Sequence, residues 1–213
     1  ISLLLMTTML DKVTAFITRR VGATAQILLL RHPYTGNQFP AGTVEEGESF
    51  EDAVQREVRE ETGLQHARIV AQLGELVEAY PGRAFTLRSE TVYARPDTHS
   101  FDWARLPRGV GVDVLRQQDG FVQVSFEEGD VYPNPAYTTY QITGWVREAC
   151  LARQMRRRIY HLTTREDTPA SWQIDVDQHR YTLFWQDMNA MPEIVHPQDE
   201  YWQRFGAEKI NIM

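Results

Sequence analysis

Residues 42–64 read GTVEEGESFEDAVQREVREETGL, and the interpretation of the whole chain starts from this stretch. Ser49 is a favourable N-cap residue, and Asp52 follows three residues later, where an acidic side chain stabilises the first helical turn. Residues 50–62 contain neither Gly nor Pro, and Gly63 is the residue type that commonly ends a helix. The stretch therefore predicts a helix over about 49–62.

The predicted helix carries carboxylates beside its apolar side. At 100° per residue, Glu57 and Glu61 fall within the arc of the apolar stripe formed by Phe50, Ala53, Val54 and Val58. Positions 45–61 hold eight carboxylates against two arginines, so a positive charge is expected among them. Carboxylate oxygens suit hard cations such as Mg²⁺ or Mn²⁺. The alternative is a solvated acidic helix.

The same stretch resembles the Nudix box, G-x5-E-x7-R-E-U-x-E-E-x-G-U, in which U is aliphatic. Every fixed position is matched, by Gly42, Glu48, Arg56, Glu57, Val58, Glu60, Glu61, Gly63 and Leu64. The resemblance implies a loop–helix–loop that binds a divalent metal and hydrolyses a nucleoside diphosphate linked to another moiety.

The resemblance also implies roles for the box side chains. Glu57, Glu60 and Glu61 would be the ligands of Mg²⁺ or Mn²⁺, and the expected catalytic residues are Glu48, Arg56 and Glu60. Arg56 would pair with a box carboxylate and hold it in place. Glu48 would be either a further metal-site carboxylate or a structural support. The general base would come from the box or from a later loop, where the candidates are Glu166, Asp167, Asp175 and Asp177.

Composition limits the class of partner. The 213 residues suffice for one large domain, or for one domain plus a small module. A net charge of −7 argues against a nucleic-acid polymer, but not against a small phosphorylated substrate. Cys150 is the only cysteine, so no internal disulfide is expected, and no run of 18 apolar residues predicts a membrane span. We expect a cytoplasmic protein whose natural start is Met6 or Met9.

Two apolar runs precede the box. Residues 13–18 and 25–30 are rich in β-prone side chains and predict the opening strands of a sheet. A polar loop over 31–41 then leads into the box. If the sheet lies beneath the box helix, Tyr34, Phe39 and Gly42 would contact the substrate, with His32 nearby. Each of these loop residues has an ordinary structural role as its alternative.

The region after the box is longer than a minimal Nudix domain needs. From 89 to 152 the pattern becomes short β-prone runs separated by turns. Its Leu-Pro-Arg-Gly turn at 106–109 and its Gly-Trp-Val at 144–146 resemble bacterial SH3-like domains. The alternative is a β-rich elaboration of the Nudix sheet without a core of its own.

Three further β-prone runs, at 157–162, 172–176 and 181–185, predict the return of the Nudix sheet, followed by a terminal helix at about 200–205. Four aromatic side chains in the chain suit either stacking on a nucleobase or core packing, namely Phe39, Tyr160, Trp172 and Trp185.

We therefore predict an α/β fold, a Nudix α/β/α sandwich with a mixed sheet that is interrupted by a small all-β SH3-like barrel. The expected parts are 1–88 and 153–213 for the Nudix domain and 89–152 for the insertion. The expected activity is metal-dependent hydrolysis of a nucleoside diphosphate derivative, with ADP-ribose or nucleotide sugars slightly favoured. This preference comes from Tyr80-Pro81, whose distance from the box resembles that in some ADP-ribose-type Nudix enzymes, and more weakly from Pro40-Ala41-Gly42. The alternative for Tyr80-Pro81-Gly82 is an ordinary turn. The alternative is a nucleotide-sensing or partner-docking module, in which the insertion would meet a second copy of the chain or another partner.

Overall fold

The computed structural model describes residues 8–130, 135–176, 179–206 and 209–210. The chain divides into two compact units. The first, here called the box unit, comprises residues 12–76 and 157–213. The second, here called the inserted unit, comprises residues 77–156 together with the N-terminal residues through Asp11. The predicted insertion 89–152 lies within the inserted unit.

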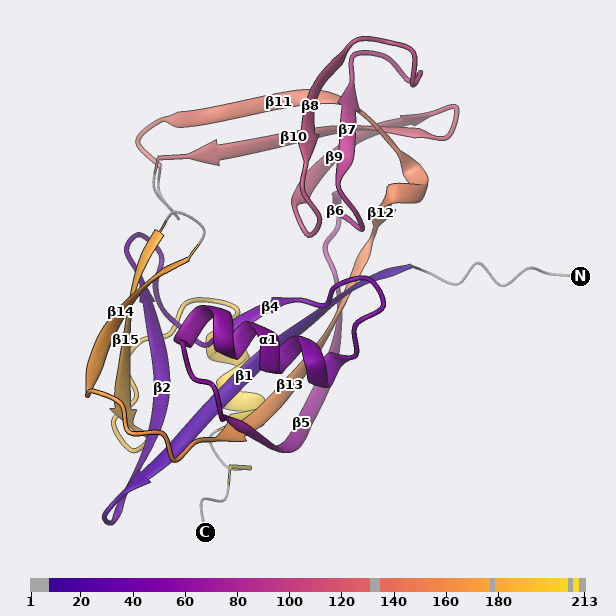
Figure 1. The fold of residues 1–213 in the computed structure, drawn as a ribbon. Helices are drawn as coiled ribbons and strands as arrows, with labels where there is room; N and C mark the ends of the chain where they lie inside the picture. The colour runs from indigo at the N-terminus through magenta and orange to yellow at the C-terminus, as the bar shows by residue number, and fades with distance from the viewer. Residues whose placement is uncertain (1–7, 131–134, 177–178, 207–208, 211–213) are drawn as a thin grey trace, which may run out of the picture. The chain divides into compact units, whose positions relative to one another are not determined.

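The box unit is built on an eight-stranded sheet (Figure 1). Its strand order is β14-β15-β2-β1-β13-β5, and two short strands are added, β3 on β2 and β4 on β1. The bounds are β1 Met9–Val21, β2 Thr24–His32, β3 Gly36–Gln38, β4 Ala41–Thr43, β5 Arg68–Ala79, β13 Gln154–Thr163, β14 Ser171–Val176 and β15 His179–Asp187. The strands expected before and after the box are therefore present in one sheet.

Strand alternation places two apolar cores on opposite faces of this sheet. On β1, Val13, Ala15 and Ile17 pack in one core and Phe16 in the other. The first core contains helix α1 (Phe50–Thr62), through Ala53, Val54 and Val58 among others. The second contains α2 (Gln198–Tyr201) and the π-helical turn η2 (Trp202–Gly206). Because side chains along a strand point alternately to the two faces, the sheet lies between helical layers. This sheet with its few helices agrees with the Nudix part of the predicted fold.

Helix α1 begins and ends where the sequence indicates. The Ser49 hydroxyl accepts a hydrogen bond from the Asp52 amide at 3.1 Å. Gly63 adopts a left-handed conformation with φ of 78°, and its amide donates to the Arg59 carbonyl at 3.0 Å. At the same end, the Trp172 indole donates to the Thr62 carbonyl at 3.0 Å. The cap, the stop and this tertiary contact together fix the helix that carries the box.

The segment before the box differs from its prediction. Residues 36–38 and 41–43, expected in a loop, form β3 and β4. Their residue types carry little strand preference, but β4 pairs with β1 between Thr43 and Lys12 and between Ala41 and Thr14. Partner strands supply the hydrogen bonds that a local pattern cannot indicate. As a result, β4 lies alongside α1 (Figure 1).

The inserted unit has its own seven-stranded sheet, in the order β12-β6-β9-β10-β11-β7-β8. The bounds are β6 Arg83–Thr86, β7 Glu90–Tyr93, β8 Asp102–Leu106, β9 Gly111–Gln118, β10 Phe121–Gly129, β11 Thr138–Arg147 and β12 Leu151–Ala152, with a 3₁₀ turn at Glu148–Cys150 before β12. A separate core forms around Val92, Val112, Val122 and Val146. The strands of this unit therefore do not elaborate the first sheet. That the unit is an SH3-like barrel stays a prediction.

No helix among the described residues is long and apolar enough to cross a membrane.

Candidate active site

The box side chains converge on the surface between α1 and β4, and Arg56 lies at their centre. Its Nε and Nη2 donate to the two carboxylate oxygens of Glu48, each at 3.0 Å. Its Nη1 donates to Glu57 at 2.9 Å and to Glu60 at 3.0 Å. Nη2 also donates to the carbonyl of Thr43 on β4, at 3.0 Å. One guanidinium thus ties three carboxylates to a strand.

These contacts change the acidity of the groups involved. The Arg56 hydrogen bonds are the main reason that the pKa of Glu48 lies below its ordinary value. The pKa of Arg56 is raised in turn, mainly by its bonds to Glu48. Glu57 behaves in the opposite way, because burial raises its pKa more than Arg56 lowers it. For Glu57, the hydrogen bond to Arg56 therefore does not fully offset the cost of removing the charged carboxylate from water.

The lack of a side chain at Gly42 makes room for Glu57. A Cβ built on Gly42 would lie 1.9 Å from the Glu57 carboxylate. Ala41, the neighbouring residue on β4, donates its amide to Oε2 of Glu61 at 2.8 Å. The two inward carboxylates are thus positioned by consecutive residues of one short strand, which explains why Gly is needed at the first box position.

Exposure separates the three predicted metal ligands. The Glu57 side chain is only 14% exposed and Glu61 is half-buried, as expected for the inward arc. Glu60 is 55% exposed, so it belongs to the rim of the site. Glu45, a box acid without a predicted role, is 68% exposed and only reaches Arg56 at 4.0 Å. Glu48, at 14%, is held between Arg56 and the Glu45 amide, which is a supporting arrangement.

The predicted substrate-contacting residues fall in different environments. Tyr34 is 52% exposed, and its ring lies 5.7 Å from that of His32. Phe39 needs correcting, because it is only 1% exposed and packs against Phe16 and Trp202 in the core between the sheet and η2. Its backbone amide and carbonyl both bond to the side chain of Gln198 in α2, which holds it against this core. We leave Phe39 out of the substrate set.

The other aromatic candidates are also packed. Tyr160 is buried, and its hydroxyl donates to Glu51 at 2.8 Å. Burial and this bond raise the pKa of Tyr160 to about 12. Trp172 and Trp185 belong to the core beneath α1, and their rings are 6.5 Å apart. Core packing, the alternative for each of them, is what the structure shows.

The later-loop carboxylates are distributed over the box unit. Glu166 accepts the backbone amides of Gln65 and His66 at 3.1 and 2.7 Å, so it supports the loop that leaves α1. Asp175 is paired with Arg180 at 2.8 Å on an exposed surface. Asp167 is exposed. Asp177 lies outside the described residues.

A divalent cation is compatible with this set of donors. The set consists of carboxylate oxygens, the ligands that hard cations prefer. Glu57 has a raised pKa in a position that Gly42 keeps open, so it gains from a nearby positive charge. Within the described part of the chain, no three acidic, His or Cys side chains already form a metal cluster. In this arrangement Arg56 bonds to Glu48, Glu57 and Glu60, and the Ala41 amide bonds to Glu61.

Comparison with known proteins agrees with the box. A family model of the NUDIX domain matches residues 10–128, more than half of the chain. The match includes the complete box and ends in β10, whereas the structure adds β13, β14 and β15 to the same sheet as the box. No curated protein matches the chain.

Proposed function

Because the chain belongs to the Nudix superfamily, whose members are pyrophosphohydrolases acting on phosphoric anhydride bonds, we propose that it cleaves the diphosphate linkage of a nucleoside diphosphate joined to another moiety. The reaction class and a small nucleotide-type substrate follow from membership. The finer statement, a substrate of the ADP-ribose or nucleotide-sugar type, is our proposal, and so is the requirement for a metal.

The observation that carries the proposal is the buried network around Arg56. A solvated acidic helix would leave its carboxylates separate and hydrated, whereas here Glu48 and Glu57 are each 14% exposed and share one guanidinium. Burying like charges together costs free energy, and such arrangements are typical of functional sites. The network therefore supports an active site over a solvated acidic face.

We propose that Glu57, Glu60 and Glu61 hold Mg²⁺ or Mn²⁺. When bound, the cation would neutralise phosphate oxygens and lower the pKa of an attacking water. Arg56 would keep Glu57 and Glu60 oriented, and Glu48 would keep Arg56 in place through two bonds to one carboxylate. Gly42 would allow close approach to Glu57, and the exposed Tyr34 would contact the remote part of the substrate.

Of the two sequence features that favoured an ADP-ribose-type substrate, the one at residues 80–82 has an ordinary structural role. Residues 80–82 form a turn, in which the Arg83 amide donates to the Tyr80 carbonyl at 3.0 Å and Gly82 has φ of 76°. The Tyr80 ring packs against Phe85, 5.6 Å away. The ADP-ribose preference therefore rests on Pro40-Ala41-Gly42 and needs a direct assay.

A hydrolysis screen tests the proposal. Purified protein is incubated with nucleotide sugars, ADP-ribose, dinucleoside polyphosphates and nucleoside triphosphates, with Mg²⁺, with Mn²⁺ or with excess chelator. We expect release of a nucleoside monophosphate from the first two classes only when metal is present. Turnover in excess chelator would refute the metal requirement. Nucleotide binding without turnover in any class would favour the sensing alternative.

A further inference from the structure

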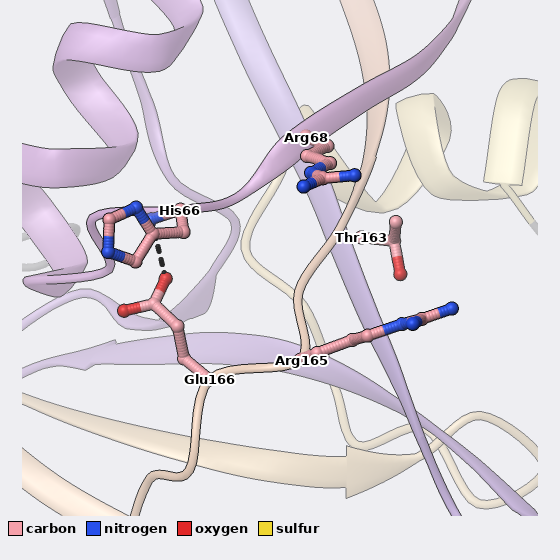
Figure 2. A pocket seen from close by; sticks show the side chains of 5 residues that line it. All are labelled: His66, Arg68, Thr163, Arg165 and Glu166. Atoms are coloured by element: carbon pink, nitrogen blue, oxygen red, sulfur yellow. Dashed lines mark hydrogen bonds between the residues drawn. The ribbon is translucent and has the colours of Figure 1, made fainter.

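A second cavity lies in the box unit and plays no part in the network around Arg56. Its volume is about 490 Å³. It is lined by His66 from the loop after α1, Arg68 at the start of β5, Thr163 at the end of β13, and Arg165 and Glu166 just beyond. In the view of Figure 2, Thr163 lies between Arg68 and Arg165.

Within the part of the chain that the structure describes, the two arginines of this cavity have no counter-ion. Among the residues that the structure describes, neither Arg68 nor Arg165 forms an ion pair or a side-chain hydrogen bond. This contrasts with Arg56, Arg147 and Arg158, each of which bonds to a carboxylate at 3.0 Å or less. Arg95 and Arg153 also form no side-chain hydrogen bond among the described residues, but Arg68 and Arg165 are the two arginines that line this cavity.

The one carboxylate of the cavity is already engaged. Both oxygens of Glu166 accept backbone amides, from Gln65 and His66, and the Thr164 hydroxyl lies at 3.4 Å. The dashed bond of Figure 2 is the one from the His66 amide. With two arginines against one glutamate, the lining keeps a net positive charge even when His66 is neutral. The Thr163 hydroxyl adds a neutral donor.

The sheet register separates this cavity from the box. The box strand β4 pairs with β1 at residues 12–14. At the cavity end, the Thr164 amide donates to the Thr18 carbonyl of β1 at 3.1 Å. Four to six residues along a strand correspond to roughly 13–20 Å. Side-chain alternation separates them further, since Tyr160 and Leu162 of β13 pack toward α1, whereas Thr163 points to the other face.

We propose that this cavity binds the phosphate group of a small phosphorylated molecule, at a site additional to the diphosphate-cleaving one. A guanidinium group suits the planar, bidentate recognition of phosphate oxygens, and two of them line this cavity. Ligand pockets commonly measure about 300–1,000 Å³, so the cavity has room for an organic group of nucleoside size besides the phosphate. The inference stands on Arg68, Arg165 and the lining, and it does not depend on the proposed hydrolysis.

The test is a binding titration of the full chain in excess chelator, where no divalent metal can support phosphate binding at the box. Inorganic phosphate and AMP are the probes, with NaCl adjusted to constant ionic strength. We expect both to shift the amide NMR signals of His66, Arg68, Thr163 and Arg165, with tighter binding of AMP if the organic group is also held. Shifts with phosphate alone still support the proposal.

Variants identify the binding groups. The double variant R68Q/R165Q should weaken binding by roughly 10- to 100-fold. The matched control R95Q/R153Q removes the same charge from two arginines that have no side-chain hydrogen bond among the described residues, and it should bind like the unmodified chain. Absence of shifts with both probes, or equal binding by the two double variants, would overturn the proposal. Hydrolysis assays on the same proteins keep this result separate from the proposed function.

Discussion

The carboxylate of Glu57 lies in the space that a side chain at position 42 would occupy. A Cβ on Gly42 would be 1.9 Å from both Cδ and Oε1 of Glu57. The atoms in conflict belong to the end of a flexible side chain, so the backbone can keep its path while the carboxylate moves. This relationship makes Gly42 a residue that positions Glu57, and it separates the effect on activity from the effect on folding.

The first prediction is that Gly42→Ala lowers kcat far more than it lowers stability. Displacing one charged group of such a site typically costs roughly 10²–10³ in rate. The displaced Glu57 side chain remains near the surface, so the melting temperature should fall by only a few degrees. Steady-state kinetics and thermal unfolding with Mg²⁺ measure the two quantities. A variant with unchanged kcat would show that the position of Glu57 does not matter.

The second prediction ranks acids of the same stretch. Glu60→Gln and Glu61→Gln should each lower kcat by roughly 10²–10³, because each removes a charge that stabilises the site. Glu45→Gln is the matched control, since this box acid is 68% exposed and only 4.0 Å from Arg56 at its nearest. Both active-site variants should also lose the rise in melting temperature caused by Mg²⁺. Equal, small losses in all three variants would mean that the run is a solvated face.

The third prediction concerns pH and His161. This side chain is 6% exposed, its Nε2 lies 2.8 Å from the Thr18 hydroxyl, and burial lowers its pKa. The folded state therefore binds a proton at His161 less readily than the unfolded state does. As a result, the free energy of unfolding is unaffected by His161 above pH 6.5, the ordinary pKa of histidine, and decreases as the pH falls below it. His161→Gln should remove that part of the acid-side loss in urea unfolding between pH 7 and 5.

The control for this prediction is His99→Gln, which replaces a histidine whose side chain is 92% exposed. Its stability profile should follow that of the unmodified chain. If His161→Gln keeps the full acid-side loss, then another group is responsible for it.

The fourth prediction addresses the inserted unit. Arg147 bonds to both oxygens of Glu90 at 2.8 Å, and the Glu90 side chain is 0% exposed. Arg147→Gln should destabilise the chain by about 3 kcal/mol, the lower end for a broken buried pair, because Arg147 itself is 46% exposed. Denaturant unfolding measures the loss. In the double variant with Glu90→Gln the loss should shrink, since no buried charge then remains unpaired.

The box could be predicted from the sequence because its information is local. Ser49, Gly63 and the absence of breakers between them define α1, and the helical period alone places Glu57 and Glu61 beside the apolar stripe. Local β-prone runs indicated five strands of the first sheet in the same way, namely β1, β2, β13, β14 and β15. Helix caps, turn residues and periodicity act over a few residues, so one sequence is enough to detect them.

Only the tertiary structure decided which distant residues meet. Residues 36–38 and 41–43 have no strand pattern, yet pairing with β2 and β1 makes them strands and brings Ala41 to Glu61 and Thr43 to Arg56. Phe39 is an aromatic residue that could stack on a ligand, but it packs against Phe16 and Trp202 in the core. Arg68 and Arg165 lie about a hundred residues apart in the chain and line one cavity because β5 and β13 are neighbours in the sheet. Such contacts depend on strand order and register, which are set by the packing of the whole core.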